Sequence, residues 1–376
     1  MIAGAGHRRA AEALAAAARA RDPQAKVECL DALEGAPLGY RRAYAWTYLA
    51  LVRWVPWLWD AAFRLLDADL VSRLVQPLRR RWNLWIAARF VRRLRALQPD
   101  AVLVTHFLPA DVCAAGRQAG WLRGPLIVVV TDLFPHRFWT ARHADALVTG
   151  TPEGAGLLRR RGIAPDKIHE IGIPIGAAFG ASPAAAALRR RLALDPGRRA
   201  ILVTSGGTTV GRFDQVVTAL RALEARIPGR LQLVVVCGED RRMARRLEAA
   251  AAASAMPVRV FGFVDDMADL MAASDLIVCK AGGLTVSEAI GSGLPLVLYH
   301  VIPGQEELNA AYVERQGAGV IARRPEAAAE AVARLIEDQS RWEAMRRAVV
   351  GLRRPDAARR IIDEVVWPLM DRRAAR

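Results

Sequence analysis

Residues 278 to 309 read VCKAGGLTVSEAIGSGLPLVLYHVIPGQEELN, and this stretch tells most about the fold of the chain. One apolar strand runs into a turn at Gly282 and Gly283, and a second ends at a Pro-Gly-Gln-Glu turn. A helix is predicted after each turn. Glycine lets backbone amides approach a ligand closely, and the helix N-terminus behind it offers unpaired N–H groups and a partial positive charge. The pattern therefore predicts a nucleotide diphosphate site that needs no metal ion.

A second motif lies at the N-terminus, where residues 4 to 14 read GAGHRRAAEAL. Both motifs resemble those of glycosyltransferase family 28. The Pro-Gly-Gln-Glu turn and the Gly-x-Gly-His opening resemble in particular its branch of monogalactosyldiacylglycerol synthases and processive diacylglycerol glucosyltransferases. The two motifs stand more than 270 residues apart and point to one family, so each supports the other. The resemblance covers most of the chain, from residue 4 to about residue 320.

Predicted strands and helices alternate along the chain. Strands are predicted in the first half at 26–30, 101–105, 125–130, 146–149 and 168–171, and in the second half at 200–204, 231–236, 258–261, 275–279 and 295–299. This alternation indicates an α/β protein with parallel sheets that carry helices on both faces. The resemblance implies the GT-B architecture, in which two Rossmann-like domains face a cleft and a C-terminal helix crosses back onto the first domain.

A Gly- and Pro-rich stretch at 172–183 has the composition of a linker. We therefore expect an acceptor- and membrane-binding domain over residues 1–172, a UDP-sugar-binding domain over 184–355 and a C-terminal helix over 356–376. The family's first strand stands directly before the Gly-x-Gly-His turn, yet only residues 1–3 precede that turn here. A buried strand contributes several apolar residues. We expect a start assigned too late, in preference to a domain that lacks a central strand.

His7 is the candidate catalytic base. The resemblance implies an inverting glycosyl transfer, in which the acceptor hydroxyl loses its proton as it attacks the anomeric carbon. Histidine has a suitable pKa for that task. At the N-terminus of a helix the dipole disfavours the imidazolium and keeps the ring neutral. The alternative role for His7 is to cap the helix and to contact only the donor phosphate.

The resemblance assigns the UDP-sugar to the second domain. The implied diphosphate contacts come from the turns and helix starts at Gly206, Gly207, Thr208, Lys280, Gly282, Gly283 and Thr285. The uracil stacks on the turn at Phe263 and Val264. Glu288 binds the ribose hydroxyls, Gln305 and Glu306 bind the hexose hydroxyls, and Asn309 joins them or orients its helix. For Lys280 the alternative is a solvated strand end, and for the turn at Phe263 it is a strand end before an Asp cap.

Four further residues are candidates for the acceptor side of the site. His106, Asp132, His136 and Trp139 follow predicted strands of the first domain. Ligands of open α/β sheets bind at the carboxyl ends of the strands. The last three also match the family's Asp…His…Trp run. The alternative is that these histidines only support the structure.

The segment 40–90 differs from the rest of the chain because tryptophans and arginines interleave in it. Its longest nearly apolar run, 43–59, falls short of the ~20 residues that span a bilayer. Aromatic rings beside arginines are typical of an interfacial helix, and the net charge of +16 favours an anionic membrane surface. No nucleic-acid-binding motif is found. The alternative is a helical cap whose aromatic side chains lie in the core.

The sequence thus predicts a metal-independent hexosyltransferase without a cofactor. Asp67-Ala68-Asp69 has the form of a metal-binding Asp-x-Asp, but we interpret it as a solvated or capping pair because it lies in a predicted helix. The resemblance implies transfer of glucose or galactose from a UDP-sugar to diacylglycerol or a related lipid, by a cytoplasmic protein on the inner face of the cell membrane. The alternatives are N-acetylglucosamine transfer to a polyprenyl-linked acceptor and a non-catalytic lipid-binding protein with the same fold.

Overall fold

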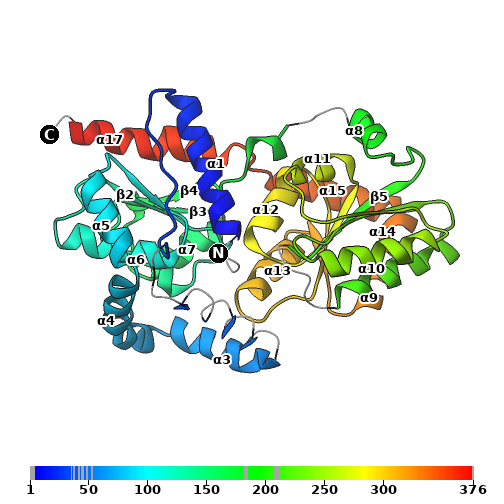
Figure 1. The fold of residues 1–376 in the computed structure, drawn as a ribbon, viewed down its shortest axis with the longest axis horizontal. Helices are drawn as coiled ribbons and strands as arrows, with labels where there is room; N and C mark the ends of the chain where they lie inside the picture. The colour runs from blue at the N-terminus through cyan, green and yellow to red at the C-terminus, as the bar shows by residue number, and fades with distance from the viewer. Residues whose placement is uncertain are drawn as a thin grey trace. The chain divides into compact units, whose positions relative to one another are not determined.

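The computed structural model describes residues 5–34, 36, 39–40, 43, 46–47, 50–51, 54–181, 185–206 and 212–374, and it is an α/β structure of two compact units (Figure 1). Unit 1 comprises Met1–Gly176, Pro303–Gln305 and Asp356–Arg376, and unit 2 comprises Ala177–Ile302 and Glu306–Pro355. The expected division differs at one place, because the Pro-Gly-Gln turn belongs to unit 1 and not to the second domain.

Unit 1 is built on a four-stranded parallel sheet. Its strands, in spatial order, are β1 (Val102–Val104), β2 (Leu126–Val129), β3 (Ala146–Thr149) and β4 (Ile168–Glu170). Its helices before the final segment are α1 (Ala5–Arg21), α3 (Pro56–Asp67), α4 (Asp69–Ile86), α5 (Ala88–Leu97), α6 (Phe107–Gln118), α7 (Pro152–Arg160) and the short 3₁₀ turns η1 (Arg137–Trp139) and η2 (Pro165–Lys167). Every residue of β2 and β3 is buried, because helices cover both faces of a parallel sheet. The predicted strands at 101–105, 125–130, 146–149 and 168–171 are confirmed.

The final segment of the chain returns to unit 1. It forms α16 (Ala357–Ile361), η5 (Ile362–Val366, a π-helical turn) and α17 (Trp367–Ala374). Ile361 and Val365 pack in one core with Leu14 of α1 and with Ile127 and Val129 of β2. The expected return of the C-terminal helix onto the first domain is confirmed.

The predicted strand at 26–30 is wrong. These residues belong to no helix and to no sheet. A strand needs a neighbour that pairs with its N–H and C=O groups. Within the described residues, the sheet of unit 1 ends at β1, which pairs only with β2. Residues 26–30 therefore have the apolar pattern of a strand without the partner that would make one.

Unit 2 holds a six-stranded parallel sheet in the order β10-β9-β8-β5-β6-β7. The strands are β5 (Arg199–Thr204), β6 (Leu231–Val236), β7 (Val258–Phe261), β8 (Leu276–Cys279), β9 (Leu296–Tyr299) and β10 (Gly319–Ala322). The helices are η3 (Ala177–Phe179), α8 (Ala185–Arg191), α9 (Phe213–Arg221), η4 (Ala222–Ala225), α10 (Arg241–Ala252), α11 (Met267–Ala273), α12 (Gly283–Gly291), α13 (Gln305–Arg315), α14 (Pro325–Glu337) and α15 (Gln339–Leu352). The first five strands confirm the prediction and β10 was not predicted. The strand order reverses between β5 and β8, which is where such sheets bind ligands.

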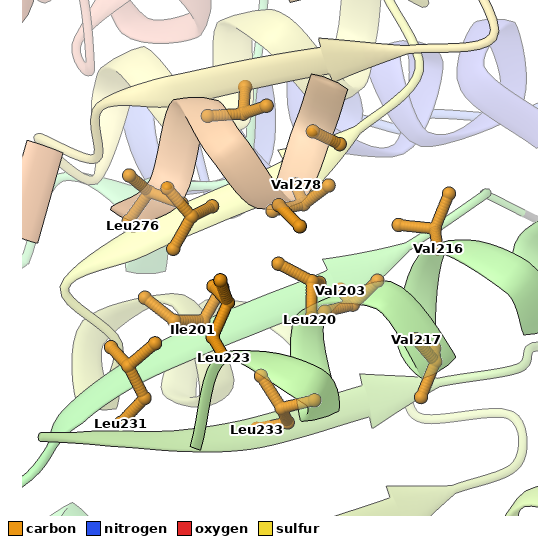
Figure 2. Close-up of a cluster of buried hydrophobic side chains, with 14 of the residues drawn as sticks. Ile201, Val203, Val216, Val217, Leu220, Leu223, Leu231, Leu233, Leu276 and Val278 are labelled. Atoms are coloured by element: carbon orange, nitrogen blue, oxygen red, sulfur yellow. The ribbon is translucent and has the colours of Figure 1, made fainter. Parts of the chain in front are cut away.

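The core of unit 2 explains why its strands were readable from the sequence. Ile201, Val203, Leu233 and Val278 point into one cluster with apolar residues of α9 (Figure 2). β6, β8 and β9 are buried at every position, so they read as continuous apolar runs. Burial on both faces is what fixes these strands.

Helices α3 and α4 leave an apolar surface exposed. On α4 the exposed side chains recur every three to four residues, and on α3 and the segment before it further tryptophans and leucines are exposed. We call this surface the α3–α4 stripe and define it by Trp46, Trp54, Trp57, Leu58, Leu65, Leu70, Leu74, Leu78, Trp82 and Trp85. The exposed fractions of these side chains lie between 41% for Leu58 and 73% for Leu78. The alternative reading, in which the aromatic residues of 40–90 lie in the core, is wrong for the five tryptophans of the stripe. In the part of the chain that the structure describes, no helix is both long and apolar enough to cross a membrane.

Candidate functional site

The first group of site residues gathers at the carboxyl edge of the sheet in unit 1. His7 lies in the first two turns of α1, Thr105 directly follows β1, and Thr131 follows β2. The Nδ1 atom of His7 is 2.7 Å from Oγ1 of Thr131. The hydroxyl of Thr105 donates to the backbone carbonyl of His7 at 2.9 Å. Since β1 and β2 are parallel neighbours, their ends meet at one place and hold the histidine between two threonines.

The ring of His7 is kept neutral by its surroundings. Burial lowers the pKa of His7 to about 4, and a hydrogen bond with the Thr105 carbonyl opposes that shift only in part. The ring of His106 stands edge-on to it at a centroid distance of 4.6 Å. Burial, with a smaller contribution from His7, holds the pKa of His106 well below its ordinary value. Both rings are therefore uncharged near pH 7, and a neutral imidazole can accept a proton.

Two more of the predicted acceptor-side residues lie beside this histidine. Trp139 is 1% exposed, and its ring centroid is 6.2 Å from that of His7. Its indole Nε1 donates to Oδ2 of Asp132 at 3.3 Å. His106 accepts a hydrogen bond from the backbone N–H of Leu108 and so caps α6. The structure thus brings His7, His106, Trp139 and Asp132 together.

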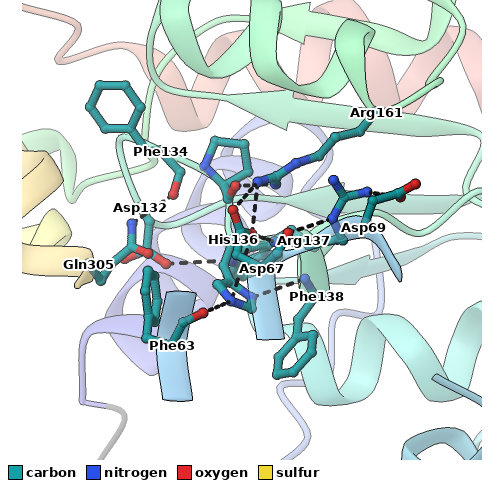
Figure 3. A network of polar contacts seen from close by, with 12 residues as sticks. Phe63, Asp67, Asp69, Asp132, Phe134, His136, Arg137, Phe138, Arg161 and Gln305 are labelled. Atoms are coloured by element: carbon teal, nitrogen blue, oxygen red, sulfur yellow. Dashed lines mark hydrogen bonds and ion pairs between the residues drawn. The ribbon is translucent and has the colours of Figure 1, made fainter. Parts of the chain in front are cut away.

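His136 belongs to a different network, which the sequence did not reveal (Figure 3). Its Nε2 atom faces the Phe63 carbonyl of α3 at 3.2 Å, and its Nδ1 accepts from the backbone N–H of Phe138. Nε2 is also 3.7 Å from Oδ1 of Asp67. The neutral ring therefore links the end of α3 to the turn η1. Burial lowers the pKa of His136, although the Asp67 charge opposes that shift.

Asp67 is the centre of this network, so its interpretation as a solvated or capping residue was wrong, whereas Asp69 is exposed at the start of α4 as expected. Arg161 donates from Nη2 to both carboxylate oxygens of Asp67 at 2.8 Å, and the backbone N–H of Arg137 donates to Oδ1 at 2.7 Å (Figure 3). The Arg161 side chain is only 4% exposed. The partners lie 70 and 94 residues from Asp67 along the chain, which is why no local pattern shows them. Among the described residues, no group of three His, Cys, Asp or Glu side chains could hold a metal ion.

Gln305 and its neighbours lie in unit 1 as well. The side-chain Nε2 of Gln305 donates to the Phe134 carbonyl at 2.7 Å. Gly304 has a φ of +87°, and a Cβ there would stand 3.0 Å from the ring of Phe63. Both the positive φ and the close ring favour glycine at this turn. The amide nitrogen of Gln305 thus ties this turn to the segment that follows β2.

The glycine turns of unit 2 stand at the carboxyl ends of β5 and β8. Gly282 is the N-cap of α12, and no atom lies within 4 Å of the place where a Cβ would be. Gly206 has a φ of +82° and donates its N–H to the Thr204 hydroxyl. Gly207 and Thr208 lie outside the described residues. Gly283 begins α12, and Lys280 and Thr285 beside it are partly exposed.

The carboxylates predicted for the donor differ in their surroundings. Glu288 is 3% exposed on α12. Glu306 accepts from the backbone N–H of Ile302 at 3.1 Å, and burial raises its pKa while the Lys280 charge lowers it. Asn309 is fully buried and donates to the Ala281 carbonyl at 2.9 Å, so it ties α13 to the Gly282 turn. Of the two roles considered for Asn309, this contact is the orienting one.

The residues predicted to meet the base lie after β7. Phe263 is 55% exposed, and Val264 beside it is partly exposed. An exposed aromatic ring at the end of a strand is free to stack on a planar base.

Both halves of the chain match family models. The model of monogalactosyldiacylglycerol synthase covers residues 7–175, and the model of the glycosyltransferase family 28 C-terminal domain covers residues 200–361. The chain belongs to glycosyltransferase family 28.

Relatives of this family 28 glycosyltransferase are similar to it in sequence over most of their length. A processive diacylglycerol beta-glucosyltransferase of Bacillus cereus (strain AH187) is 29% identical over 73% of this chain and 69% of its own. The enzyme of the same name from Bacillus cytotoxicus is 28% identical over 75% of this chain and 72% of its own. Among solved structures, MurG of Acinetobacter baumannii matches with a TM-score of 0.55 at 18% identity, over 73% of this chain and 75% of its own. A UDP-GlcNAc 2-epimerase from Neisseria meningitidis bound to UDP-GlcNAc matches with a TM-score of 0.57 at 14% sequence identity, over 74% of this chain and 80% of its own. The structural matches show the GT-B fold.

Proposed function

We propose that this protein transfers a hexose from a UDP-hexose to the free hydroxyl of diacylglycerol, with inversion, at a membrane surface. The observation that carries the proposal is the pairing of two halves, one of monogalactosyldiacylglycerol synthase type and one of family 28 donor-binding type. The relatives named as diacylglycerol glucosyltransferases support the same lipid acceptor. The neutral His7 ring supplies the chemistry that this reaction needs.

In the proposed reaction His7 acts as general base. The acceptor oxygen attacks the anomeric carbon of the hexose and forms the new C–O bond, while its proton passes to Nε2 of His7. The bond from the anomeric carbon to the diphosphate oxygen breaks, and UDP leaves with the electron pair. General bases of this kind contribute about 10²- to 10⁴-fold to the rate.

The donor is proposed to bind unit 2. The N–H groups at the start of α12 and the charge of Lys280 stabilise the negative charge that grows on the leaving diphosphate. Phe263 stacks on the uracil, and Glu288 accepts from the ribose hydroxyls. Glu306 and Oε1 of Gln305 accept from the hexose hydroxyls.

The α3–α4 stripe is proposed to dock the protein on an anionic membrane. Leu70, Leu74, Leu78 and Trp82 recur at intervals of four along α4, so they lie along one side of the helix. Monomeric soluble proteins rarely expose contiguous apolar surface of this extent. Arginines flank the stripe and the net charge is +16, which favours a negatively charged lipid surface such as the inner leaflet of the cell membrane.

The test is glycolipid formation on vesicles that contain diacylglycerol, with UDP-glucose and UDP-galactose offered separately and products identified by mass spectrometry. We expect one donor to give a hexosyl-diacylglycerol, and His7→Ala to lower kcat by about 10²- to 10⁴-fold while UDP still binds. Binding of UDP without product from either donor would contradict the proposal. A polyprenyl-linked acceptor would then be tested next.

A further inference from the structure

The hydroxyl of Thr131 is the hydrogen-bond partner of the His7 ring. Oγ1 of Thr131 stands 2.7 Å from Nδ1, across 124 residues of sequence, and Thr131 is 4% exposed. A general base works only if the nitrogen that faces the substrate has no hydrogen. A neutral imidazole carries its one hydrogen on either Nδ1 or Nε2. The partner of Nδ1 therefore decides whether Nε2 can accept a proton.

The surroundings of Thr131 offer its hydroxyl hydrogen a second acceptor besides the His7 ring. A hydroxyl donates once and can accept at the same time. Oγ1 of Thr131 also lies 3.3 Å from the carbonyl oxygen of Thr105, which can only accept. When Thr131 donates to this carbonyl, its oxygen must receive the hydrogen of Nδ1.

We propose that Thr131 is the positioning residue that holds His7 as the Nδ1–H tautomer, by accepting from Nδ1 and donating to the Thr105 carbonyl. Nε2 is then left with its lone pair toward the acceptor hydroxyl. This inference rests on the proposed function, in which His7 is the base. Thr131 acts through the ring of His7 and is assigned no contact with the substrates.

A hydroxyl in this place has a different effect from a carboxylate. A carboxylate next to Nδ1 fixes the tautomer and also stabilises the imidazolium, as in the Ser-His-Asp triad. An uncharged oxygen fixes the tautomer alone. Burial lowers the pKa of His7 to about 4 and holds the pKa of His106 well below its ordinary value, and no carboxylate at Nδ1 opposes the shift of His7. The hydroxyl of Thr131 thus orients the ring of His7 without adding a negative charge to the site.

The first test reads the tautomer directly. Protein labelled with ¹⁵N-histidine has six imidazoles, and His7 is assigned by the signal that His7→Gln removes. Two-bond ¹H–¹⁵N correlations distinguish a protonated from an unprotonated ring nitrogen. We expect Nδ1–H in the wild type and a shift toward Nε2–H in Thr131→Val. A wild-type Nε2–H tautomer, or an unchanged tautomer in Thr131→Val, would overturn the proposal.

The second test is kinetic and uses a conservative rescue. Thr131→Val should lower kcat by about 10- to 100-fold, part of what a general base contributes, with KM for the UDP-hexose unchanged. Thr131→Ser keeps the hydroxyl and should recover most of the rate. In the His7→Ala background Thr131→Val should have no further effect. If Thr131→Val lowers kcat by the same factor in the wild type and in His7→Ala, its role is merely structural. The same conclusion follows if Thr131→Ser is as slow as Thr131→Val.

The matched control is Thr105→Val. It removes a hydroxyl bond of similar length to the same histidine, but to the backbone carbonyl and not to the ring. We expect the Nδ1–H tautomer to persist in Thr105→Val, and a shift like that of Thr131→Val would overturn the proposal. If the wild type makes no glycolipid, the proposed function fails, and the tautomer measurement still decides this inference. If His7→Ala is slow but Thr131→Val is as fast as the wild type, only this inference fails.

Discussion

His7 is held in a place where burial outweighs a hydrogen bond that favours its protonation. The fall of its pKa to about 4 means that the ring of His7, the proposed base, is neutral throughout the physiological range. His106, the titratable ring in contact with it, is shifted in the same direction. Neither ring therefore gains a proton until the pH falls well below the ordinary value for histidine.

This shift predicts the pH dependence of the reaction. A base must be unprotonated, so kcat/KM is lost as pH falls through the pKa of the free enzyme. We expect kcat/KM for the lipid acceptor to stay level from pH 8 down to about 5 and to fall only as pH approaches about 4. The measurement is a pH series with a fluorescence check that the fold persists. An acid limb near 6.5 would contradict the burial of His7.

At the residue scale, the sequence predicted the residues that stand in motifs and missed those defined by contact. His7 and the run that contains Asp132 and Trp139 could be found because the family keeps them at fixed spacing. Thr131 directly precedes that run, but its role depends on the pairing of β1 with β2, which brings residues 105 and 131 to one edge. One feature of the sequence could have indicated this contact, because Thr105 ends one predicted strand and Thr131 directly follows the next.

Among the elements, the helix pair α3 and α4 carries the largest departure from an ordinary protein surface. Leu74 and Leu78 are each more than 70% exposed at adjacent turns of α4. Fully burying a leucine side chain is worth about 1.5–3 kcal/mol. If lipid covers them, glutamate at both positions removes that gain and adds like charge against an anionic surface.

We therefore predict that Leu74→Glu/Leu78→Glu lowers binding to vesicles of anionic lipid by at least about 10-fold, as measured by cosedimentation. The thermal unfolding temperature should change little, because both side chains are already exposed. Leu97→Glu on α5 is the control, since Leu97 is 43% exposed and lies outside the stripe. Equal binding by the double variant and the control would show that the stripe does not face lipid.

The joint between α3 and α4 is fixed by the ion pair of Asp67 with Arg161. Removing one partner of a pair whose other member is buried costs about 3–5 kcal/mol. Asp67→Ala should therefore lower the free energy of unfolding by up to that amount, because Arg161 is left buried without its charge partner. Urea unfolding measures the change.

Asp69→Ala provides the comparison for Asp67→Ala. Asp69 pairs with Arg73 and Arg137, but its side chain is half exposed, and exposed ion pairs contribute at most about 1 kcal/mol. Similar losses for the two variants would mean that the Asp67 network is no more than a surface pair.

The strands show what sequence patterns can and cannot predict about an element. The strands β6, β8 and β9 of unit 2 were found to within a residue because burial on both faces leaves continuous apolar runs. Residues 26–30 alternate charged and apolar side chains as a half-buried strand does, but they have no neighbour, and pairing is not encoded locally. The short strand β10 escaped because its four residues, from Gly319 to Ala322, carry too little apolar pattern.

At the scale of the whole molecule, unit 1 is assembled from segments separated by all of unit 2. Ile361, Ile362, Val365 and Val366 from the final segment are each at most 3% exposed in the core that covers β2 and β3. Four such side chains contribute roughly 6–12 kcal/mol by burial, which is comparable to the whole stability of a domain.

A chain that ends at Pro355 should therefore lose the fold of unit 1 and keep that of unit 2. We expect calorimetry and limited proteolysis to show one cooperative, protease-resistant unit with residues 185–355, and vesicle-dependent glycosyl transfer to disappear. Survival of a folded unit 1 in this variant would show that the returning helices are dispensable for its core.

The return of the segment from Ala357 to Ala374 also sets an order of events during synthesis. The ribosome makes the polypeptide from the N-terminus, and domains generally fold in that order. Here the first domain to emerge lacks one covering layer until the second has been translated in full. Until then α1 alone covers that face of the sheet, and the exposed apolar side chains of the α3–α4 stripe are present on the same nascent polypeptide.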